Sequence, residues 1–301
     1  MQYLRSFKLA SESDELNFVL SPAGSMHDME CYSSLGGYPF QIFPRKELEY
    51  LEFAPVTIIY GGNGSGKSTL LNIIAEKTGI RRTAPFNNTP FFEHYLDYCE
   101  YESYTGSLRM PRDSEIITSD GVFDFLLDVR AVNEGVDNVR TSLMEEFYEL
   151  REDCKKNGWN ISSLEEYDEL KRRNDARKKK NTASQYAVKR MRARDIVGKS
   201  NGESAYLYFT ERIKSDALYL LDEPENSLSA RLQGELAQFI EDSARFYRCQ
   251  FIISTHSPFL LSIKGARIYD LDSCPAQVKR WTELENVCAY RDLFEKHRNE
   301  F

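Results

Sequence analysis

Long apolar runs, paired cysteines and an excess of positive charge are all missing from this chain. No apolar segment approaches the ~20 residues that a membrane-spanning helix needs. Residues 1–7 lack the apolar core of a signal peptide, so we expect a cytoplasmic protein with no membrane partner. The six cysteines include no C-x-x-C pair, which favours packed thiols over a zinc site or a disulfide framework. The net charge of −8 argues against uniform affinity for nucleic acid.

The length and composition of the chain are typical of a globular protein with one or two domains. The chain has 301 residues, of which 41% are hydrophobic and 29% are charged. These proportions are ordinary for a folded domain, and the length is sufficient for a large core.

The most informative stretch is GGNGSGKST at residues 61–69, which fits G-x-x-x-x-G-K-[ST] in full. Residues 56–60 before it are apolar and β-branched, as in a buried strand, and residues 70–75 after it are typical of a helix. Glycines let the backbone curl so that its N–H groups point at phosphate oxygens, and the helix N-terminus adds positive potential. The predicted nucleotide-binding residues are Gly61, Gly62, Asn63, Gly64, Ser65, Gly66, Lys67, Ser68 and Thr69. Lys67 would reach the β- and γ-phosphates, and Ser68 would bind Mg²⁺. The alternative is a glycine-rich turn without a ligand.

The rest of the chain alternates strands with helices. Residues 3–9, 16–20, 38–43 and 56–60 predict strands and hairpins, residues 81–120 are irregular, and a helical pattern begins at Val122. In the second half, the predicted elements are a short helix at 205–213, a strand at 217–221, a helix at 229–246 and a strand at 250–254. This alternation is typical of parallel βαβ units.

Two groups of polar residues follow these later strands. Asp222 and Glu223 end an apolar strand, so they should lie at the carboxyl edge of the sheet, where ligands of open α/β folds bind. There Asp222 could hold Mg²⁺, and Glu223 could polarise the water that attacks the γ-phosphate. His256 follows the next strand at the same edge and could donate a hydrogen bond to that phosphate. A helix cap and a structural histidine are the alternatives.

A third candidate anion site precedes these strands. Ser200, Asn201, Gly202 and Glu203 open a predicted helix, 22 residues before Asp222. A serine hydroxyl and glycine N–H groups at a helix start can bind an anion without a nearby lysine. A simple helix cap is the alternative.

Residues 171–194 are strongly basic, with eleven lysines and arginines against the single acid Asp175. A solvated helix face is the usual meaning of a charge run. Because this run has one sign within an acidic chain, it could also bind phosphate-rich partners such as DNA or RNA, through their backbone. Only Tyr186 is aromatic within it, so base stacking is not indicated.

Together these motifs resemble the ABC-class ATPases, over roughly residues 45–80 and 195–272. The similarity is greatest to the soluble branch, which includes chromosome-maintenance and DNA-repair ATPases of the SMC and RecF kind and predicted ATPases of bacterial defence systems. The resemblance implies that two subunits sandwich two ATP molecules, with the phosphate loop of one facing the signature of the other. It makes residues 200–203 the signature, Asp222 and Glu223 the Walker B end, residues 226–229 the D-loop, and His256 the switch histidine.

The chain departs from that family at several positions. Asn201 replaces a glycine of the signature, and no glutamine occurs between Gln41 and Gln185, so the family's Q-loop residue is missing. Ser119 or Asp120 could fill that metal-sensing role. For adenine stacking, the candidates are Phe40 and Phe43.

We therefore expect an α/β protein, a P-loop ABC-type ATPase head with a β-rich N-terminal part. Its core would comprise residues 1–84 and 204–301, interrupted by a mostly helical lobe at 85–203. The expected cofactors are ATP and Mg²⁺. The expected function is an ATP-hydrolysing homodimeric switch or clamp in a DNA-related or antiviral defence module that controls an effector protein.

Two other functions remain open. One is an ATP-binding regulatory or scaffold subunit with little turnover, against which Glu223 argues because such a protein can dispense with a general base. The other is the ATPase subunit of a membrane transporter, against which the missing glutamine and the sequence of residues 225–229 argue.

Overall fold

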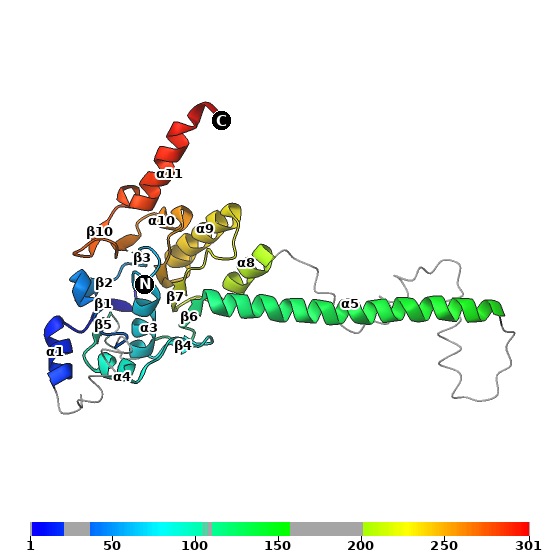
Figure 1. The fold of residues 1–301 in the computed structure, drawn as a ribbon, viewed down its shortest axis with the longest axis horizontal. Helices are drawn as coiled ribbons and strands as arrows, with labels where there is room; N and C mark the ends of the chain where they lie inside the picture. Colours follow the sequence, from blue (N-terminus) through cyan, green and yellow to red (C-terminus); the bar gives the residue numbers. More distant parts are fainter. Residues whose placement is uncertain (1, 21–36, 105, 107–109, 157–200, 301) are drawn as a thin grey trace. The chain divides into compact units, whose positions relative to one another are not determined.

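The computed structural model describes residues 2–20, 37–104, 106, 110–156 and 201–300. The chain divides into two compact units, Met1–Asp124 with Asn201–Phe301, and Phe125–Ser200. Helix α5 (Ser119–Lys156) begins in the first unit, and its later turns are the described part of the second (Figure 1). In the described residues, no helix is long and apolar enough to cross a membrane.

A seven-stranded sheet organises the first unit, with the strand order β10-β9-β3-β8-β7-β6-β4. Its strands are β3 (Val56–Tyr60), β4 (Arg81–Arg82), β6 (Glu115–Thr118), β7 (Leu218–Asp222), β8 (Gln250–Ser254), β9 (Arg267–Asp270) and β10 (Gln277–Lys279). All neighbours pair in parallel except β10, which pairs antiparallel to β9. The parallel pairing brings the carboxyl ends of β3, β8, β7 and β6 to one edge, as the alternation of strands and helices predicts.

A smaller antiparallel sheet has the order β2-β1-β5. Its strands are β1 (Leu4–Lys8), β2 (Tyr50–Glu52) and β5 (Glu100–Ser103). The remaining helices of the first unit are α1 (Glu12–Leu20), α3 (Lys67–Thr78), α4 (Pro90–Asp97), α8 (Asn201–Arg212), α9 (Ala230–Phe246), α10 (Pro258–Leu261) and α11 (Glu285–Lys296), with short 3₁₀ turns at Pro44–Lys46, Trp281–Glu283 and Arg298–Glu300.

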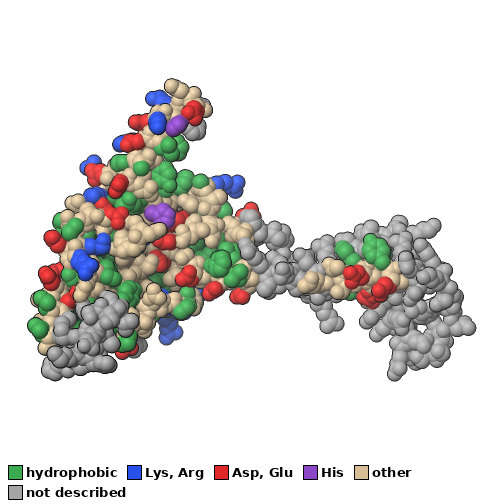
Figure 2. All heavy atoms as spheres, in the orientation of Figure 1, with side chains coloured by type: hydrophobic (Ala, Val, Ile, Leu, Met, Phe, Trp, Pro, Cys, Tyr) green, Lys and Arg blue, Asp and Glu red, His purple; other side chains and the backbone are tan. Residues whose placement is uncertain are grey.

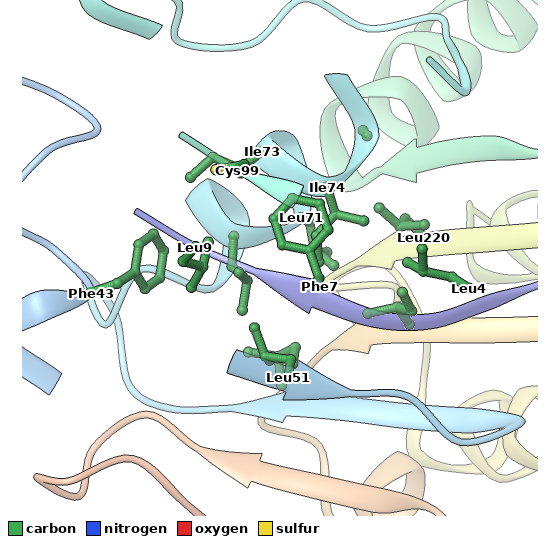
Figure 3. Packing of buried hydrophobic residues seen from close by; sticks show 14 of the residues in the cluster. Leu4, Phe7, Leu9, Phe43, Leu51, Leu71, Ile73, Ile74, Cys99 and Leu220 are labelled. Carbon is green, nitrogen blue, oxygen red and sulfur yellow. The ribbon is translucent and has the colours of Figure 1, made fainter. Parts of the chain in front are cut away.

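Helix α3 is the centre of the main core. Phe7 of β1, Leu71 of α3 and Leu220 of β7 belong to one cluster of buried side chains (Figure 3). In β7, Leu218 and Leu220 join this cluster, whereas the ring of Tyr219, on the other face, stacks on that of Phe251 at 5.8 Å. The period of two in a strand explains the division. Because both faces of β7 are buried, the strand is held in place and its last residue is kept at the edge of the sheet.

Gln250 fixes strand β1 against the large sheet. Its side-chain carbonyl accepts from the backbone N–H groups of Tyr3 and Leu4, at 2.7 and 2.9 Å, and its amide donates to Leu4 O at 2.8 Å. The side chain is fully buried, so its amide group satisfies backbone N–H and C=O groups at the start of β1 that would otherwise be buried without partners.

Glu115 is a buried carboxylate held by two arginines. Its oxygens accept from Arg81 at 2.6 Å and from Arg212 at 2.5 Å, while Glu115 itself is 0% exposed. Arg212 belongs to the last turn of α8, so this contact attaches the helix that begins with the predicted signature residues to strand β6.

We expect Glu115→Ala to lower the free energy of unfolding by about 1.5–3 kcal/mol, because two hydrogen bonds to a charged group are lost. Urea unfolding followed by circular dichroism measures this. Asp113→Ala is the matched control, since Asp113 forms only an exposed 3.7 Å pair with Lys214 and should change stability by less than about 0.5 kcal/mol. Equal stabilities of the two variants would contradict the importance of this contact.

The structure corrects several local predictions in the first half. Residues 16–20 belong to helix α1 rather than to a strand, because Ser11 and Asp14 cap each other: Asp14 N donates to Ser11 Oγ at 3.2 Å and Ser11 N donates to Asp14 Oδ2 at 3.0 Å. Residues 38–43 form turns, and residues 81–120 are not irregular, since they contain β4, α4, β5 and β6. The strands predicted at 56–60 and 250–254 are confirmed.

The predicted domain boundaries also differ from the division seen here. Residues 85–124 belong to the first unit, because β6 lies inside the large sheet between β7 and β4. The other boundary falls at 200/201, close to the predicted 203/204. The basic segment 171–194 and Ser200 lie outside the described residues.

Candidate nucleotide site

The loop at residues 61–66 joins β3 to α3, as the motif predicts. Gly64 and Gly66 have φ angles of 78° and 97°, which side chains rarely adopt. A Cβ on Gly66 would lie 2.9 Å from Ile42 Cγ2, and one on Gly61 would lie 2.5 Å from Ser65 Oγ. Both conformation and space therefore require glycine where the backbone curls.

Lys67 lies under this loop with its ammonium group held by oxygen atoms. Its Nζ donates to Gly61 O at 2.9 Å and Gly62 O at 3.0 Å, and lies 3.5 Å from Glu223 Oε1. The side chain is only 4% exposed. A cation is thus fixed inside the curl of the loop, next to the carboxylate predicted to be the general base.

Asp222 lies beside the first turn of α3. Its Oδ1 accepts from Ser68 Oγ at 3.0 Å and from Ser254 Oγ. Burial raises the pKa of Asp222, an effect that the two serine hydroxyls and Lys67 oppose. A cation bound to Asp222 would favour its charged form. The hydroxyl and carboxylate oxygens of Ser68 and Asp222 are the hard donors that Mg²⁺ prefers, so the residues present fit this ion.

Glu223 is held in an uncommon backbone conformation. Its φ is 47°, in the left-handed region. Its N–H donates to Ser254 O at 3.0 Å and Ser254 Oγ at 3.1 Å, while Asn226 Nδ2 donates to Glu223 Oε2 at 3.0 Å. These bonds keep the carboxylate at the end of β7, and they connect it to the predicted D-loop at residues 226–229.

Strand register explains why these groups meet. Thr118 of β6 pairs with Asp222 of β7, which pairs with Ser254 of β8, and Ser254 pairs with Ile59 of β3. Four strands therefore end at one level, directly beside the phosphate loop. This is the carboxyl edge at which the sequence placed the site.

A pocket of about 490 Å³ opens beside Ser68, Asp222 and Glu223. Its lining residues are Tyr38, Ser68, Thr69, Asn72, Arg82, Pro85, Phe86, Asn87, Thr118, Ser119, Asp120, Asp222 and Glu223. Ser119 and Asp120, suggested as replacements for the missing glutamine, are thus brought to the predicted metal ligands. Phe40 and Phe43 are 1% and 0% exposed, so the structure is against either ring stacking on a base.

The described residues of the predicted signature, Asn201, Gly202 and Glu203, form the first turn of α8. A Cβ on Gly202 would lie 3.1 Å from Leu232 Cδ1 and 3.4 Å from Ser227 O, so α8 packs closely on α9 and the predicted D-loop. None of these three residues is among those that line the pocket.

His256 follows β8, between the ends of β7 and β3. Its side chain is 47% exposed, and its Nδ1 lies 3.4 Å from Glu225 Oε1. Asn286 at the start of α11 donates from Nδ2 to His256 O at 2.8 Å. The ring is therefore accessible on a backbone that is anchored from two sides.

Two contributors to the site were not predicted from the sequence. Ser254 bonds both Asp222 and Glu223, and strand pairing could have indicated it. Asp272, after β9, accepts the Gly62 N–H on both carboxylate oxygens, at 3.0 and 2.8 Å, and so holds the entry of the phosphate loop. No sequence signal marks Asp272, because this contact spans 210 residues of chain.

Residues 158–262 match a family model described as "AAA domain, putative AbiEii toxin, Type IV TA system". The match covers roughly a third of the chain and includes α8, β7, α9 and β8, whereas the phosphate loop lies outside it. A parallel sheet with the phosphate loop and the paired carboxylates at one edge settles the fold class. The fold is a mixed α/β fold built on a parallel sheet, with the glycine-rich loop at its carboxyl edge. The predicted α/β class is thereby confirmed.

Among curated protein sequences, none matches this chain. Solved structures with a similar arrangement include "a putative metal-chelate type ABC transporter", at 16% identity and a TM-score of 0.41, covering 97% of this chain and 90% of that one. Another is an Smc head domain from Pyrococcus furiosus with an extended coiled coil, bound to the C-terminal domain of ScpA, at 16% identity and a TM-score of 0.38, covering 82% and 95%. A dimeric ATP-binding cassette bound to ADP and Pi has 15% identity and a TM-score of 0.35, covering 78% and 90%. Each TM-score is below 0.5, so these structures say nothing of this chain's ligands or partners.

Proposed function

We propose that this protein binds and hydrolyses ATP and that ATP closes a homodimer that acts as a switch or clamp. The observation that carries the proposal is the meeting of Lys67, Ser68, Asp222 and Glu223 at the end of β7, beside the phosphate loop. The cation and the loop N–H groups would bind the phosphates, and Glu223 would accept a proton from the attacking water. Mg²⁺ on Ser68 and Asp222 would neutralise the developing phosphate charge.

The dimer is supported by how the signature lies in the fold. Residues 201–203 are absent from the lining of the pocket that holds Ser68 and Asp222. In an ATP sandwich, the signature of the partner subunit would complete the site. His256, accessible at the same sheet edge, would donate to the γ-phosphate.

Measurement of phosphate release tests the proposal. We expect ATP turnover in the presence of Mg²⁺ and its loss when EDTA removes the metal, because Asp222 would then repel the phosphates. Asp222→Asn should reduce turnover by at least about 10²-fold, as expected when a charged group that acts at the developing phosphate charge is removed. Glu235→Gln, a change in an exposed i,i+4 pair on α9, serves as the matched control. Mg²⁺-dependent nucleotide binding with no turnover would instead favour a regulatory subunit.

We also propose that the switch serves a defence-related module, through an effector protein or nucleic acid. The family description, which names a toxin–antitoxin system, supports this setting. Figure 2 shows acidic and basic side chains interspersed over the visible face of the first unit, so the basic segment 171–194 is the stronger candidate for a nucleic-acid contact.

If that segment binds DNA or RNA, affinity should fall steeply with salt, the log–log slope growing by about 0.7–0.9 for each phosphate neutralised. Replacing residues 177–180 by alanine or serine should flatten the slope and leave basal turnover intact. Fluorescence anisotropy with purified DNA and RNA measures this. No binding to either at low salt, with or without ATP, would assign the segment to protein docking.

A further inference from the structure

Glu225 is a buried carboxylate to which the proposed function gives no role. It lies two residues after Glu223 and is 6% exposed. One oxygen, Oε1, takes every polar contact recorded for its side chain: Thr255 Oγ1 donates to it at 2.6 Å, His256 N donates at 3.0 Å, and His256 Nδ1 lies 3.4 Å away. The other oxygen, Oε2, is buried without a hydrogen-bond partner. Buried carboxylates are rare unless they are paired, so this one calls for a specific explanation.

The chemistry of the contact determines what the ring can do. An ionised carboxylate only accepts hydrogen bonds, so an imidazole nitrogen that faces it is stabilised with its proton on. The hydrogen bond made by one ring nitrogen sets the state of the other. With one proton held on Nδ1, the His256 ring donates from Nε2 to a phosphate only when it carries a second proton there, because the neutral Nδ1–H ring presents a lone pair at Nε2.

We propose that Glu225 is a positioning residue that sets the orientation of the His256 ring and the tautomer of its neutral form, holding one proton on Nδ1 so that Nε2 faces the nucleotide. This inference rests on the proposed function, in which His256 contacts the γ-phosphate. It goes further by assigning the state of the ring to one neighbouring carboxylate.

The surroundings of His256 support this division of roles. Asn286 Nδ2 donates to the carbonyl of His256, and Ser257 Oγ donates to Gln233 Oε1 at 2.7 Å. These bonds hold the backbone and the following residue. Among the described residues, the polar contact recorded for the ring itself is with Glu225.

Glu225 also connects the ring to the D-loop. Its carbonyl accepts from Leu228 N at 2.9 Å, and its neighbour Asn226 bonds the Glu223 carboxylate at 3.0 Å. A partner subunit that displaces residues 226–229 would therefore move Glu225, and with it the ring of His256.

Long-range ¹⁵N–¹H correlation spectra of histidine side chains, recorded at alkaline pH where the imidazoles are neutral, test the proposal without any turnover. A His256→Ala spectrum identifies the His256 signals. We expect the wild-type ring to carry its proton on Nδ1, and Glu225→Gln to shift the population toward the Nε2–H form. Glu235→Gln should leave the signals unchanged. An Nε2–H ring in the wild-type protein would overturn the proposal, and this outcome does not depend on Glu225→Gln being folded.

Kinetics gives the second measurement. Glu225→Gln keeps the size of the side chain and an acceptor for Thr255 Oγ1, but it loses the charge. We expect kcat to fall by about 10-fold or more with KM for ATP little changed, because a mispositioned ring affects mainly the transition state. Glu225→Asp, which keeps the charge, should retain more activity. If Glu225→Gln alters the tautomer of the His256 ring and leaves kcat unchanged, the tautomer of that ring does not affect turnover. Lack of turnover in the wild type would count against the proposed function alone, since the spectra do not depend on it.

Discussion

Glu223→Gln is expected to convert the protein into a stable dimer when ATP is added. The amide cannot take a proton from water, so hydrolysis should fall by about 10²- to 10⁴-fold while nucleotide binding persists. The bonds that hold this side chain tolerate the change, because Asn226 Nδ2 can still donate to the amide oxygen. Multi-angle light scattering with and without ATP and Mg²⁺ measures the molar mass.

A second substitution shows whether that dimer is the proposed sandwich. Adding Ser200→Arg to Glu223→Gln should return the protein to the monomer. The arginine side chain is larger than that of serine and would occupy the space of the γ-phosphate of the ATP that the partner subunit binds. Glu235→Gln is the control and should remain a monomer with ATP at the same concentration, since it can still hydrolyse the nucleotide. A Glu223→Gln protein that is monomeric with ATP would contradict the sandwich for this chain taken alone.

Lys67→Ala is expected to weaken nucleotide binding strongly. The Nζ atom is already positioned by Gly61 O and Gly62 O, within the loop that would receive the phosphates. Hydrogen bonds to charged groups contribute about 1.5–3 kcal/mol, so affinity should fall by about 10- to 100-fold or more. Isothermal titration calorimetry with ATP and Mg²⁺ measures this loss.

The matched control is Lys77→Ala, in the last turn of the same helix. Lys77 Nζ donates to Leu96 O at 2.7 Å, away from the phosphate loop. The loss of this bond should affect stability modestly and leave the affinity for ATP unchanged. Equal affinities of Lys67→Ala and the wild type would remove the central argument for a nucleotide site.

The parts of the site that could be predicted are those whose chemistry is local in sequence. The phosphate loop needs glycine at Gly64 and Gly66 for its φ angles, and the strand before it needs apolar, β-branched residues. Likewise, Asp222 and Glu223 follow a fully apolar strand, so their position at a sheet edge follows from the pattern alone. Their roles in binding and catalysis remain predictions.

The parts that escaped prediction depend on contacts between distant segments. The apolar pattern of residues 16–20 fits either a helix or a strand. The hydrogen bonds between Ser11 and Asp14 favour helix α1. Strand β6 is four residues long and follows an aromatic, proline-containing stretch, so nothing local shows that it lies inside the sheet. Asp272 and Glu225 act across 210 and 31 residues of chain, respectively.

An α/β core with a phosphate loop and two carboxylates at a strand end could therefore be predicted from the amino-acid pattern. Backbone conformation and side-chain periodicity are local properties, and these motifs depend on them. Only the tertiary structure decided that Thr118, Asp222, Ser254 and Ile59 end at one level, and that Glu225 lies beside His256. Strand order and register are set by how whole faces bury one another, which no single segment of the chain encodes.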